Sequence, residues 1–461
     1  MGKRGKRQRQ EEFWIPSTTI VQTPGHAFYN RLNEVLAARG FDARVERLCR
    51  RYYPGHRGRP SLPPGVYFRC LLIGYFEGLD SERGIAWRVA DSLSLRKFLG
   101  YGIDEGTPDH STLSRTRRLF AVSTHQAVFR WVVQVLSEAG VLEGQTILLD
   151  GTTLEANAAL RSIVRRDTGE SYEAYLTRLA EAAGIDHPTR EDLARFDRKR
   201  PKKGSNAEWE HPHDPAARIT RMKDGRTHLA HKVEHAVDAV AGALVAIAVH
   251  PADAGDTRTG LETMAAAQAT VEALGLPGIE EGVLDKGYHS DAVLVALEDL
   301  GIRSYIAEPK RGRRRWRGKG VAQDAVYANR RRLRGARNKR LQAQRAELCE
   351  RSNAHLYETG GMRRLHLRGR ANILKRLLLH GAAFNLGILM RTLYRVGTPR
   401  SLQGTAAVLS ALVQWLRVRL GTLCTVFMER ASTHPSPLAR SDVVSDNADL
   451  PSSKHLTTTG S

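Results

Sequence analysis

Two aspartates each follow a short apolar run and could together hold a cation. Asp150 ends the run ILL at 147–149, and Asp285 ends the run GVL at 282–284. A carboxylate at the end of a buried strand costs free energy unless something cationic meets it, and a metal ion, an arginine and solvent are the candidates. If the two strands are neighbours in one sheet, the acids face each other and repel unless a cation lies between them. A simple turn is the alternative for the first strand, because Asp followed by Gly favours turns.

Paired carboxylates of this kind suit magnesium chemistry on a phosphate backbone. Mg²⁺ typically takes one or two carboxylates together with substrate phosphate. Two ions about 3.5–4 Å apart can activate an attacking oxygen and stabilise a leaving one. A third carboxylate is expected from a late helix, where RAELCERSNAHLYETGG offers Glu347, Glu350 and Glu358. The first two lie one turn apart on one helical face, so spacing alone does not separate them.

The charge balance favours a polyanionic partner. Lys and Arg number 71 against 49 Asp and Glu, which gives a net charge of +22. A hydrophobic content of 41% argues against wholesale disorder, so a folded basic protein is expected. No run reaches the roughly 18 to 20 apolar residues of a membrane span. We therefore expect nucleic acid as the partner and no membrane association.

The cysteines and the N-terminus indicate a cytoplasmic protein. Cys49, Cys70, Cys349 and Cys424 lie far apart and lack metal-binding spacing, so free thiols in a reducing compartment are expected. The opening MGKRGKRQRQ is basic, but no apolar core follows it, so it is not a secretory signal.

The first part of the chain, to about residue 140, has helical periodicity. Asp109 or Ser111 could cap a short helix near its end. That helix carries three arginines that are candidate DNA contacts: Arg115, Arg117 and Arg118. Several short helices ending in a basic one suggest a DNA-binding module. An ordinary helical bundle with a basic surface is the alternative.

Strands and helices alternate from about residue 141 to 395. The strand around 147–149 is followed by a polar segment at about 161–224, which we interpret as an insertion. The strands THLAHKVEHAVD and ALVAIAVHPAD then form a hairpin through Ala241-Gly242. Helix, strand, helix and strand follow, and after a basic stretch a helix is expected at about 337–358. The pattern predicts a mixed α/β sheet layered with helices.

The expected domains follow these composition shifts. They are a disordered basic leader at 1–11, a helical domain at 12–140, an α/β domain at 141–395, a helical segment at 396–429 and a polar disordered tail at 430–461.

A dense basic stretch follows the last expected strand. It contributes further candidate DNA contacts: Arg314, Trp316, Arg317, Tyr327, Arg330 and Lys339. Charge runs are commonly just solvated surface, but the arginines suit phosphate contacts and Trp316 could stack on a base.

Several longer motifs occur together and in order: LLDGTTLEANAALRSIVRRDTGESYEAYLTRLA, MKDGRTHLAHKVEHAVD, LDKGYHS, YANRRRLRGARNKR and ERSNAHLYETGGMRRLHLRGRANILKRLLLHGAAFNLGILMR. With the earlier RPSLPPGVYFRCLLIGYFEGLDSERGIAWRVADS and PDHSTLSRTRRL, they resemble the DDE transposases of bacterial insertion sequences. The group most similar is the insertion-sequence family numbered 1182, and the resemblance covers roughly residues 12 to 400.

The resemblance implies a ribonuclease-H-like catalytic core that carries an insertion and follows an all-α N-terminal DNA-binding domain. Its Asp, Asp and Glu would bind two Mg²⁺ ions, with Mn²⁺ as a substitute, at Asp150, Asp285 and Glu350. Arg363 and Arg364, just after the Glu350 stretch, complete the expected DNA contacts. Ser352-Asn353 and Arg370-Ala371 depart from the family pattern.

The implied activity is transposition in the bacterial cytoplasm, associated with the nucleoid. The partners would be the terminal inverted repeats of the element, target DNA and a second copy of the chain in a dimeric or larger synaptic complex. A catalytically inactive protein that binds and represses element ends is the alternative, and a general nuclease of the same fold is a third.

Two histidine clusters invite a metal interpretation, and we expect structural roles for both. His228 and His231 point to opposite faces of one strand, and His235 lies about 13 Å from His231. His211 and His213, in EWEHPHDP, lie next to Pro212 and Pro215, which favour a loop.

Overall fold

The computed structural model describes residues 26–53, 61–201, 204–222, 224–310, 312 and 314–399. All of them belong to one compact unit, residues 1–403. The leader at 1–11, the tail at 430–461, Cys424 and all of the expected segment 396–429 beyond residue 399 lie outside the described residues.

The described residues between 26 and 140 are helical, as predicted. The helices are α1 (Ala27–Ala38), α2 (Phe41–Cys49), η2 (Arg50–Tyr52), α3 (Pro64–Glu77), α4 (Glu82–Asp91), α5 (Leu93–Leu99), α6 (His110–Leu119) and α7 (Val122–Glu138). Polar caps begin three of them. The side chains of Ser81, Ser92 and Asp109 accept backbone N–H groups at the starts of α4, α5 and α6. Asp109, one of the two predicted caps, therefore begins the basic helix.

A mixed sheet forms the centre of the second part, as predicted. Its strands are β1 (Thr146–Glu155), β4 (Arg218–Arg221), β5 (Thr227–Asp238), β6 (Leu244–Pro251), β7 (Glu281–Leu284) and β8 (Arg303–Ile306). The order is β4-β5-β1-β7-β8, and β6 also pairs with β5. β5 is antiparallel to β1 and β6, while β7 is parallel to β1 and β8. The predicted β5–β6 hairpin is confirmed, and Gly242 supplies the left-handed φ of 68° that its turn needs.

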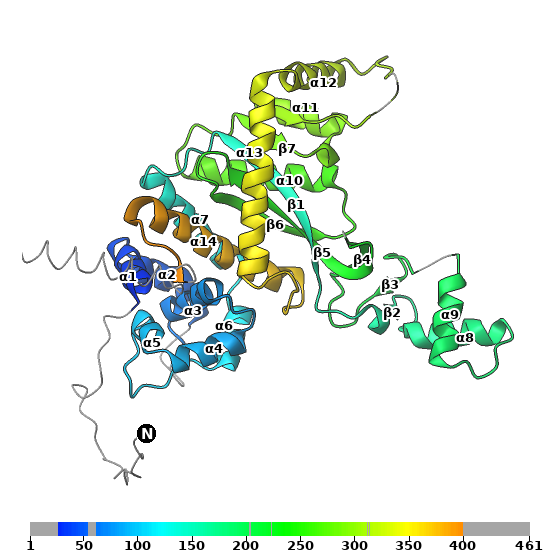
Figure 1. Ribbon diagram of the computed structural model, residues 1–461, viewed down its shortest axis with the longest axis horizontal. Helices are drawn as coiled ribbons and strands as arrows, with labels where there is room; N and C mark the ends of the chain where they lie inside the picture. Colours follow the sequence, from blue (N-terminus) through cyan, green and yellow to red (C-terminus); the bar gives the residue numbers. More distant parts are fainter. Residues whose placement is uncertain are drawn as a thin grey trace, which may run out of the picture. The chain divides into compact units, whose positions relative to one another are not determined.

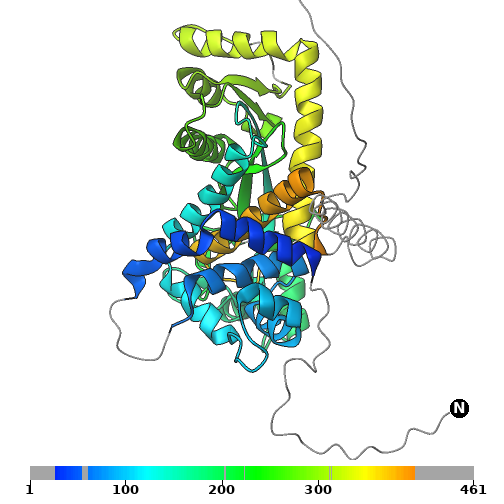
Figure 2. The same cartoon turned by 90° about the vertical axis from the view of Figure 1, so that its left-hand side faces the viewer.

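Helices cover both faces of this sheet (Figures 1 and 2). They are α10 (Asp256–Ala273), η4 (Lys286–Tyr288), α11 (Asp291–Asp299), α12 (Gly320–Leu333) and α13 (Ala336–Asn353), which continues as the π-helix η5 (Ala354–Thr359). The helix predicted at about 337–358 is therefore α13 with η5. α12 lies within the basic stretch, where the sequence predicted no helix.

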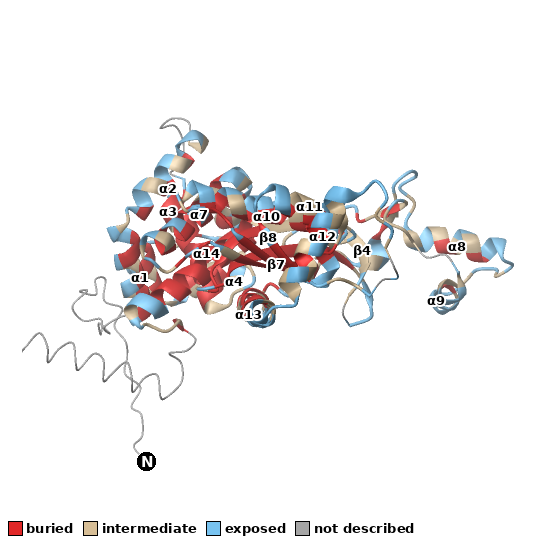
Figure 3. Ribbon diagram, turned by 90° about the horizontal axis from the view of Figure 1, so that it is seen from above, coloured by how far each residue is buried: buried red, intermediate tan, exposed pale blue. Residues whose placement is uncertain are grey.

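The long helix α14 (Arg370–Tyr394) joins the sheet to the N-terminal helices. It packs on α7, α3 and β6. Asn385 donates to the carbonyl of Leu244 and accepts its N–H, both at 2.8 Å, which satisfies backbone groups of β6. α14 is long and apolar enough to cross a membrane, but 89% of its most apolar window is buried within the protein, as expected of a core helix. The hydrophobic core is continuous from the N-terminal helices to the sheet (Figure 3).

The segment between β1 and β5 has its own small elements. They are η3 (Leu160–Ser162), β2 (Val164–Arg165), α8 (Tyr172–Ala182), α9 (Arg190–Lys199) and β3 (Trp209–Glu210). β2 pairs with β3, and Trp209 packs edge-on against Tyr172 and Tyr175. We refer to residues 161–224 as the insertion. Small separate clusters of buried residues hold it together, so its stability does not depend only on the main core.

Candidate active site

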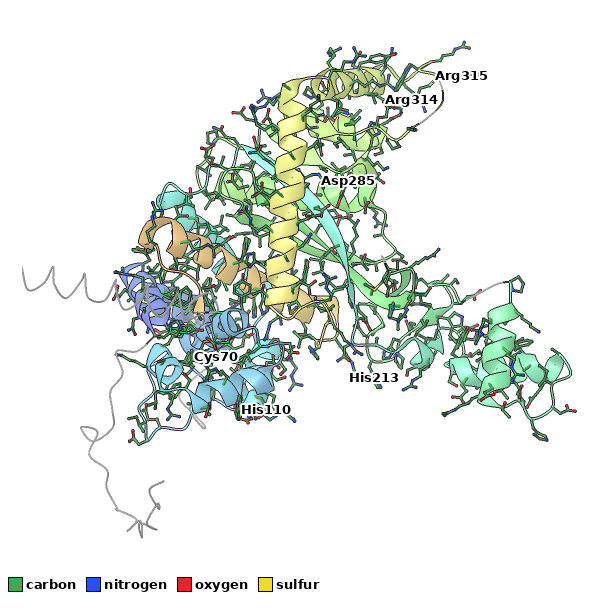
Figure 4. The ribbon with its side chains drawn as sticks, in the orientation of Figure 1. Cys70, His110, His213, Asp285, Arg314 and Arg315 are labelled. Atoms are coloured by element: carbon green, nitrogen blue, oxygen red, sulfur yellow. The ribbon has the colours of Figure 1, made fainter. Side chains whose placement is uncertain are left out.

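Strand register brings Asp150 and Asp285 together. β1 and β7 are parallel neighbours, with Leu149 opposite Leu284, and each aspartate is the next residue along its chain. Asp150 lies within β1, while Asp285 comes directly after β7 and precedes η4. Figure 4 labels Asp285 beside α13. The expectation that these strands are neighbours, and that their acids converge, agrees with this register.

An arginine bridges the two carboxylates. Arg345 on α13 places Nη1 3.2 Å from Asp150 Oδ1 and Nη2 3.7 Å from Asp285 Oδ1. Its side chain is only 16% exposed. Two turns later on the same helix, Asn353 donates its amide to Asp150 Oδ2 at 3.4 Å. The cation that the sequence required between the acids is therefore supplied here by Arg345, which sequence reasoning missed. The sequence does contain a feature that could have identified Arg345. This arginine lies at helical spacing between Leu341 and Leu348, two buried apolar positions of α13.

Glu350 lies on the same helix but is exposed, and it is five residues after Arg345, which is about 140° around the helix axis. Among the described residues, no group of three or more His, Cys, Asp or Glu side chains is arranged to hold a metal ion. The other two glutamates that the sequence offered point elsewhere. Glu347 pairs with Arg351, and Glu358 pairs with Arg363. The fold therefore brings two of the three expected acids together, and the role of Glu350 stays a prediction.

A buried polar cluster holds α13 and η5 against the sheet beneath Asp150. His235 is directly opposite Asp150 in the β1–β5 register, so both side chains point to the same face. His235 Nδ1 lies 3.2 Å from Ser352 Oγ, and its Nε2 lies 2.7 Å from Tyr357 Oη. Burial lowers the pKa of His235 to about 3. Burial, followed by the charge of Asp150, raises the pKa of Tyr357. Both groups are therefore neutral, and His235 has the structural role expected of it.

The opposite face of the sheet anchors the residues after Asp285. Glu234 is fully buried opposite Gly151. It accepts hydrogen bonds from Tyr288 Oη at 3.0 Å and Thr263 Oγ1 at 2.6 Å, and Lys232 Nζ lies 3.0 Å away. Burial, together with Glu234, raises the pKa of Tyr288, which keeps this phenol a donor. Because Tyr288 ends η4, these bonds fix the turn that presents Asp285.

Most of the expected DNA contacts have exposed side chains, although Arg363 also pairs with Glu358 and Arg364 lies 3.8 Å from Glu155. The exposed ones are Arg115, Arg118, Arg317, Tyr327, Lys339, Arg363 and Arg364. Arg117 is instead buried and pairs with Glu82 at 2.6 Å, so it fastens α6 to α4. Arg330 makes a two-pronged ion pair with Glu308, at 2.7 and 2.9 Å.

Trp316 is only partly available for stacking. The guanidinium of Arg314 lies 4.4 Å from the centre of its ring, and Arg314 itself pairs with Asp291 and Glu308. Figure 4 labels Arg314 and Arg315 in this region. Ion pairs within the protein therefore engage three of the expected contacts: Arg117, Arg314 and Arg330. The exposed cations are better placed to contact a phosphate backbone.

Comparison with known proteins assigns a class to the N-terminal helices. Residues 18–119, which include α1 to α6, match the family model described as Transposase domain (DUF772). No solved structure matches the chain. The family match supports a transposase, which is a DNA-processing enzyme, and implies interaction with DNA.

Proposed function

We propose that this protein binds the terminal inverted repeats of its own insertion sequence, cleaves DNA strands by metal-dependent hydrolysis and joins the freed 3′-hydroxyl ends to target DNA. One observation carries the proposal. Asp150 and Asp285 lie side by side at the ends of parallel neighbouring strands, in a chain whose N-terminal helices match a transposase domain.

The sheet supports a ribonuclease-H-like core. Three antiparallel strands, β6, β5 and β1, precede two strands, β7 and β8, that are parallel to β1 and lie on its other side. This is the arrangement that the resemblance implies, with the first acid on the central strand β1 and the second directly after its parallel neighbour.

The carboxylate pair fits a divalent cation. Asp150 and Asp285 offer the hard oxygens that Mg²⁺ and Mn²⁺ prefer, and the position of Arg345 indicates that their charges converge on one cation. Glu350 projects from the same helix and is our candidate for the third ligand. Bound ions would activate the attacking oxygen and stabilise the leaving one.

The chain's own residues would then orient the DNA. Asp150 and Asp285 would hold the ion, and Arg345 would then pair with a phosphate, as arginine guanidinium groups commonly do. The exposed cations of α12 and α13 would hold the flanking backbone. Both element ends must be held together, so we propose a dimer or larger synaptic complex, acting at the bacterial nucleoid.

The direct test is strand nicking and joining on DNA that carries the element's own ends, with Mg²⁺ or with EDTA. We expect cleavage with Mg²⁺ that disappears in EDTA and in Asp285→Asn. The matched control is Asp299→Asn, an exposed aspartate at the end of α11, which should cleave like the wild type. Cleavage that persists in Asp285→Asn would remove the catalytic assignment.

A second function is favoured by the placement of Arg345 and Glu350. An arginine fills the gap between the two aspartates, while Glu350 is exposed and outside the pair. A catalytically inactive protein that represses element ends would have this arrangement. It predicts tight binding to the ends with no divalent-dependent cleavage, so the same experiment separates the two functions.

A further inference from the structure

A polar pocket lies where the insertion meets the far end of β1. Its volume is about 500 Å³, within the usual size range of ligand sites. The polar residues that matter for its chemistry are Asn157, His211, His213, His228, Arg364 and Arg368. None of these side chains belongs to the pair of aspartates described above. We propose that the pocket binds a phosphate group and that the group is a backbone phosphodiester of bound DNA, an assignment of source that rests on the proposed function.

His211 lines this pocket and has a ring N–H that can donate a hydrogen bond. It is only 3% exposed, and its Nδ1 accepts the backbone N–H of His213 at 3.2 Å. Burial lowers the pKa of His211, and the positive charges of Arg368 and His213 lower it further, so the ring is neutral. A neutral ring that accepts at Nδ1 carries its proton on Nε2. That N–H suits an anion and does not suit a metal ion, which needs an unprotonated nitrogen.

The pocket carries more positive than negative groups. Arg368 donates Nε to the carbonyl of Asn157 at 3.1 Å, which holds its guanidinium at the pocket. Arg364 is largely exposed. Glu155 is the one acid among the lining residues, and it is 3.8 Å from Arg364 and 3.7 Å from His228. One carboxylate therefore faces two arginines, which leaves capacity for a further negative charge.

Buried contacts hold the walls of the pocket in place. Asp214 and His231 are fully buried, with Oδ2 and Nε2 3.1 Å apart. The other oxygen of Asp214 accepts the N–H of Gly369 at 3.2 Å. These bonds tie the insertion, β5 and the segment before α14 together. The N–H of Leu365 also donates to the carbonyl of Glu155 at 3.0 Å, which fixes the arginine segment to β1.

The distance to the aspartates suits a single DNA strand that contacts both places. Asp150 and Glu155 are five residues apart within β1, and five residues of strand span about 16 Å. Consecutive nucleotides of a duplex strand are about 3.4 Å apart along the axis. A DNA strand that follows β1 from the aspartates to the pocket would place the bound phosphate about five nucleotides from the cleaved bond. Figure 4 labels Asp285 and His213, which mark the two places.

The first experiment measures the affinity of the full-length protein for a labelled DNA duplex as a function of salt. In Arg368→Gln we expect the slope of log K against log salt to fall by about 0.9, a loss on the order of tenfold in affinity at 0.1 M salt. The matched control is Arg178→Gln, an exposed arginine on α8 outside the pocket, whose slope should stay close to that of the wild type. His211→Gln provides a second variant, and thermal unfolding checks that each variant folds.

The second experiment locates the phosphate. Single methylphosphonates, which lack the phosphate charge, are placed along DNA that carries an element end. The wild type should lose affinity at a position about five nucleotides from the cleavage point, and Arg368→Gln should be insensitive there. Equal sensitivity of the two proteins at every position would overturn the assignment.

The third arm separates DNA from free anions. If inorganic phosphate or deoxyadenosine monophosphate raises the Tm of the wild type but not of Arg368→Gln, while DNA affinity is unchanged, the DNA source is wrong. If the wild type and Arg368→Gln have the same DNA affinity and the same Tm response to these anions, the assignment of a phosphate to this pocket is wrong. Failure of the proposed function would show instead as intact pocket-dependent binding without Mg²⁺-dependent cleavage.

Discussion

At the scale of single residues, Arg345 controls how the two aspartates meet a cation. Its guanidinium lies between Asp150 and Asp285, so a divalent ion must displace it. We predict that Arg345→Gln binds Mn²⁺ more tightly without DNA, on the order of tenfold, because a competing positive charge is removed. Electron paramagnetic resonance of free Mn²⁺ measures this. Arg340→Gln, an exposed arginine of the same helix, is the control, and equal affinities in both variants would contradict the prediction.

His235 makes stability depend on pH. Burial lowers its pKa from 6.5 to about 3, so the folded protein keeps it neutral while the unfolded chain protonates it below pH 6.5. Stability is therefore full above pH 6.5 and falls as the pH drops toward 3, by about 1.4 kcal/mol per pH unit. At pH 5 the loss from this one group is about 2 kcal/mol.

Urea unfolding of the wild type and His235→Gln at pH 5 and pH 7 tests this prediction. The variant should be less stable at pH 7, because it loses the contacts with Ser352 and Tyr357. Between pH 7 and pH 5, the free energy of unfolding of the variant should fall by about 2 kcal/mol less than that of the wild type. His125, whose pKa burial lowers to about 4, titrates in both proteins and cancels in the comparison. Parallel pH profiles would show that His235 does not carry the effect.

At the scale of elements, α10 and the turn after β7 pack too closely for any side chain at Gly260. A Cβ there would lie 2.4 Å from Cδ1 of the Tyr288 ring. We predict that Gly260→Ala destabilises the protein by about 1–3 kcal/mol, because displacing the ring also breaks its bond to Glu234. The better helix propensity of alanine offsets this by less than about 1 kcal/mol.

The free energy of urea unfolding measures that loss. Gly320→Ala, at the first position of α12, is the control, since its Cβ would meet nothing within 4 Å. It should be neutral or slightly stabilising. Equal effects of the two substitutions would mean that the close packing at Tyr288 does not limit stability.

Elements with a clear apolar period could be predicted from the sequence, and elements fixed by distant contacts could not. The β5–β6 hairpin and the cap of α6 follow from local patterns. α12 was missed because arginines surround its short apolar stripe at Ala325 and Val326. The same limit applies to the site. Apolar runs ending in acid predicted Asp150 and Asp285, but the rotation of α13, which turns Arg345 toward them, depends on packing against the sheet.

At the scale of the whole molecule, a net charge of +22 predicts DNA binding that is strongly salt-dependent. The effect of a particular cation depends on whether it is already paired. Arg317 and Lys339 are exposed on the basic segment near α12 and α13, whereas Arg314 and Arg330 neutralise acids of the protein. Counting charges does not distinguish exposed cations from paired ones. The two kinds should differ in how much each contributes to phosphate binding.

We predict that the double variant Arg317→Gln, Lys339→Gln lowers the slope of log K against log salt by about 2, since each lost phosphate contact removes about 1. Fluorescence anisotropy with a labelled duplex at several salt concentrations measures the slope. The control is Arg190→Gln, Arg195→Gln, which removes the same charge from exposed positions of α9. If the protein binds DNA through a specific surface, the control slope stays near that of the wild type. An equal decrease in both variants would mean that the charge acts as a diffuse field, and the DNA contacts assigned to Arg317 and Lys339 would be wrong.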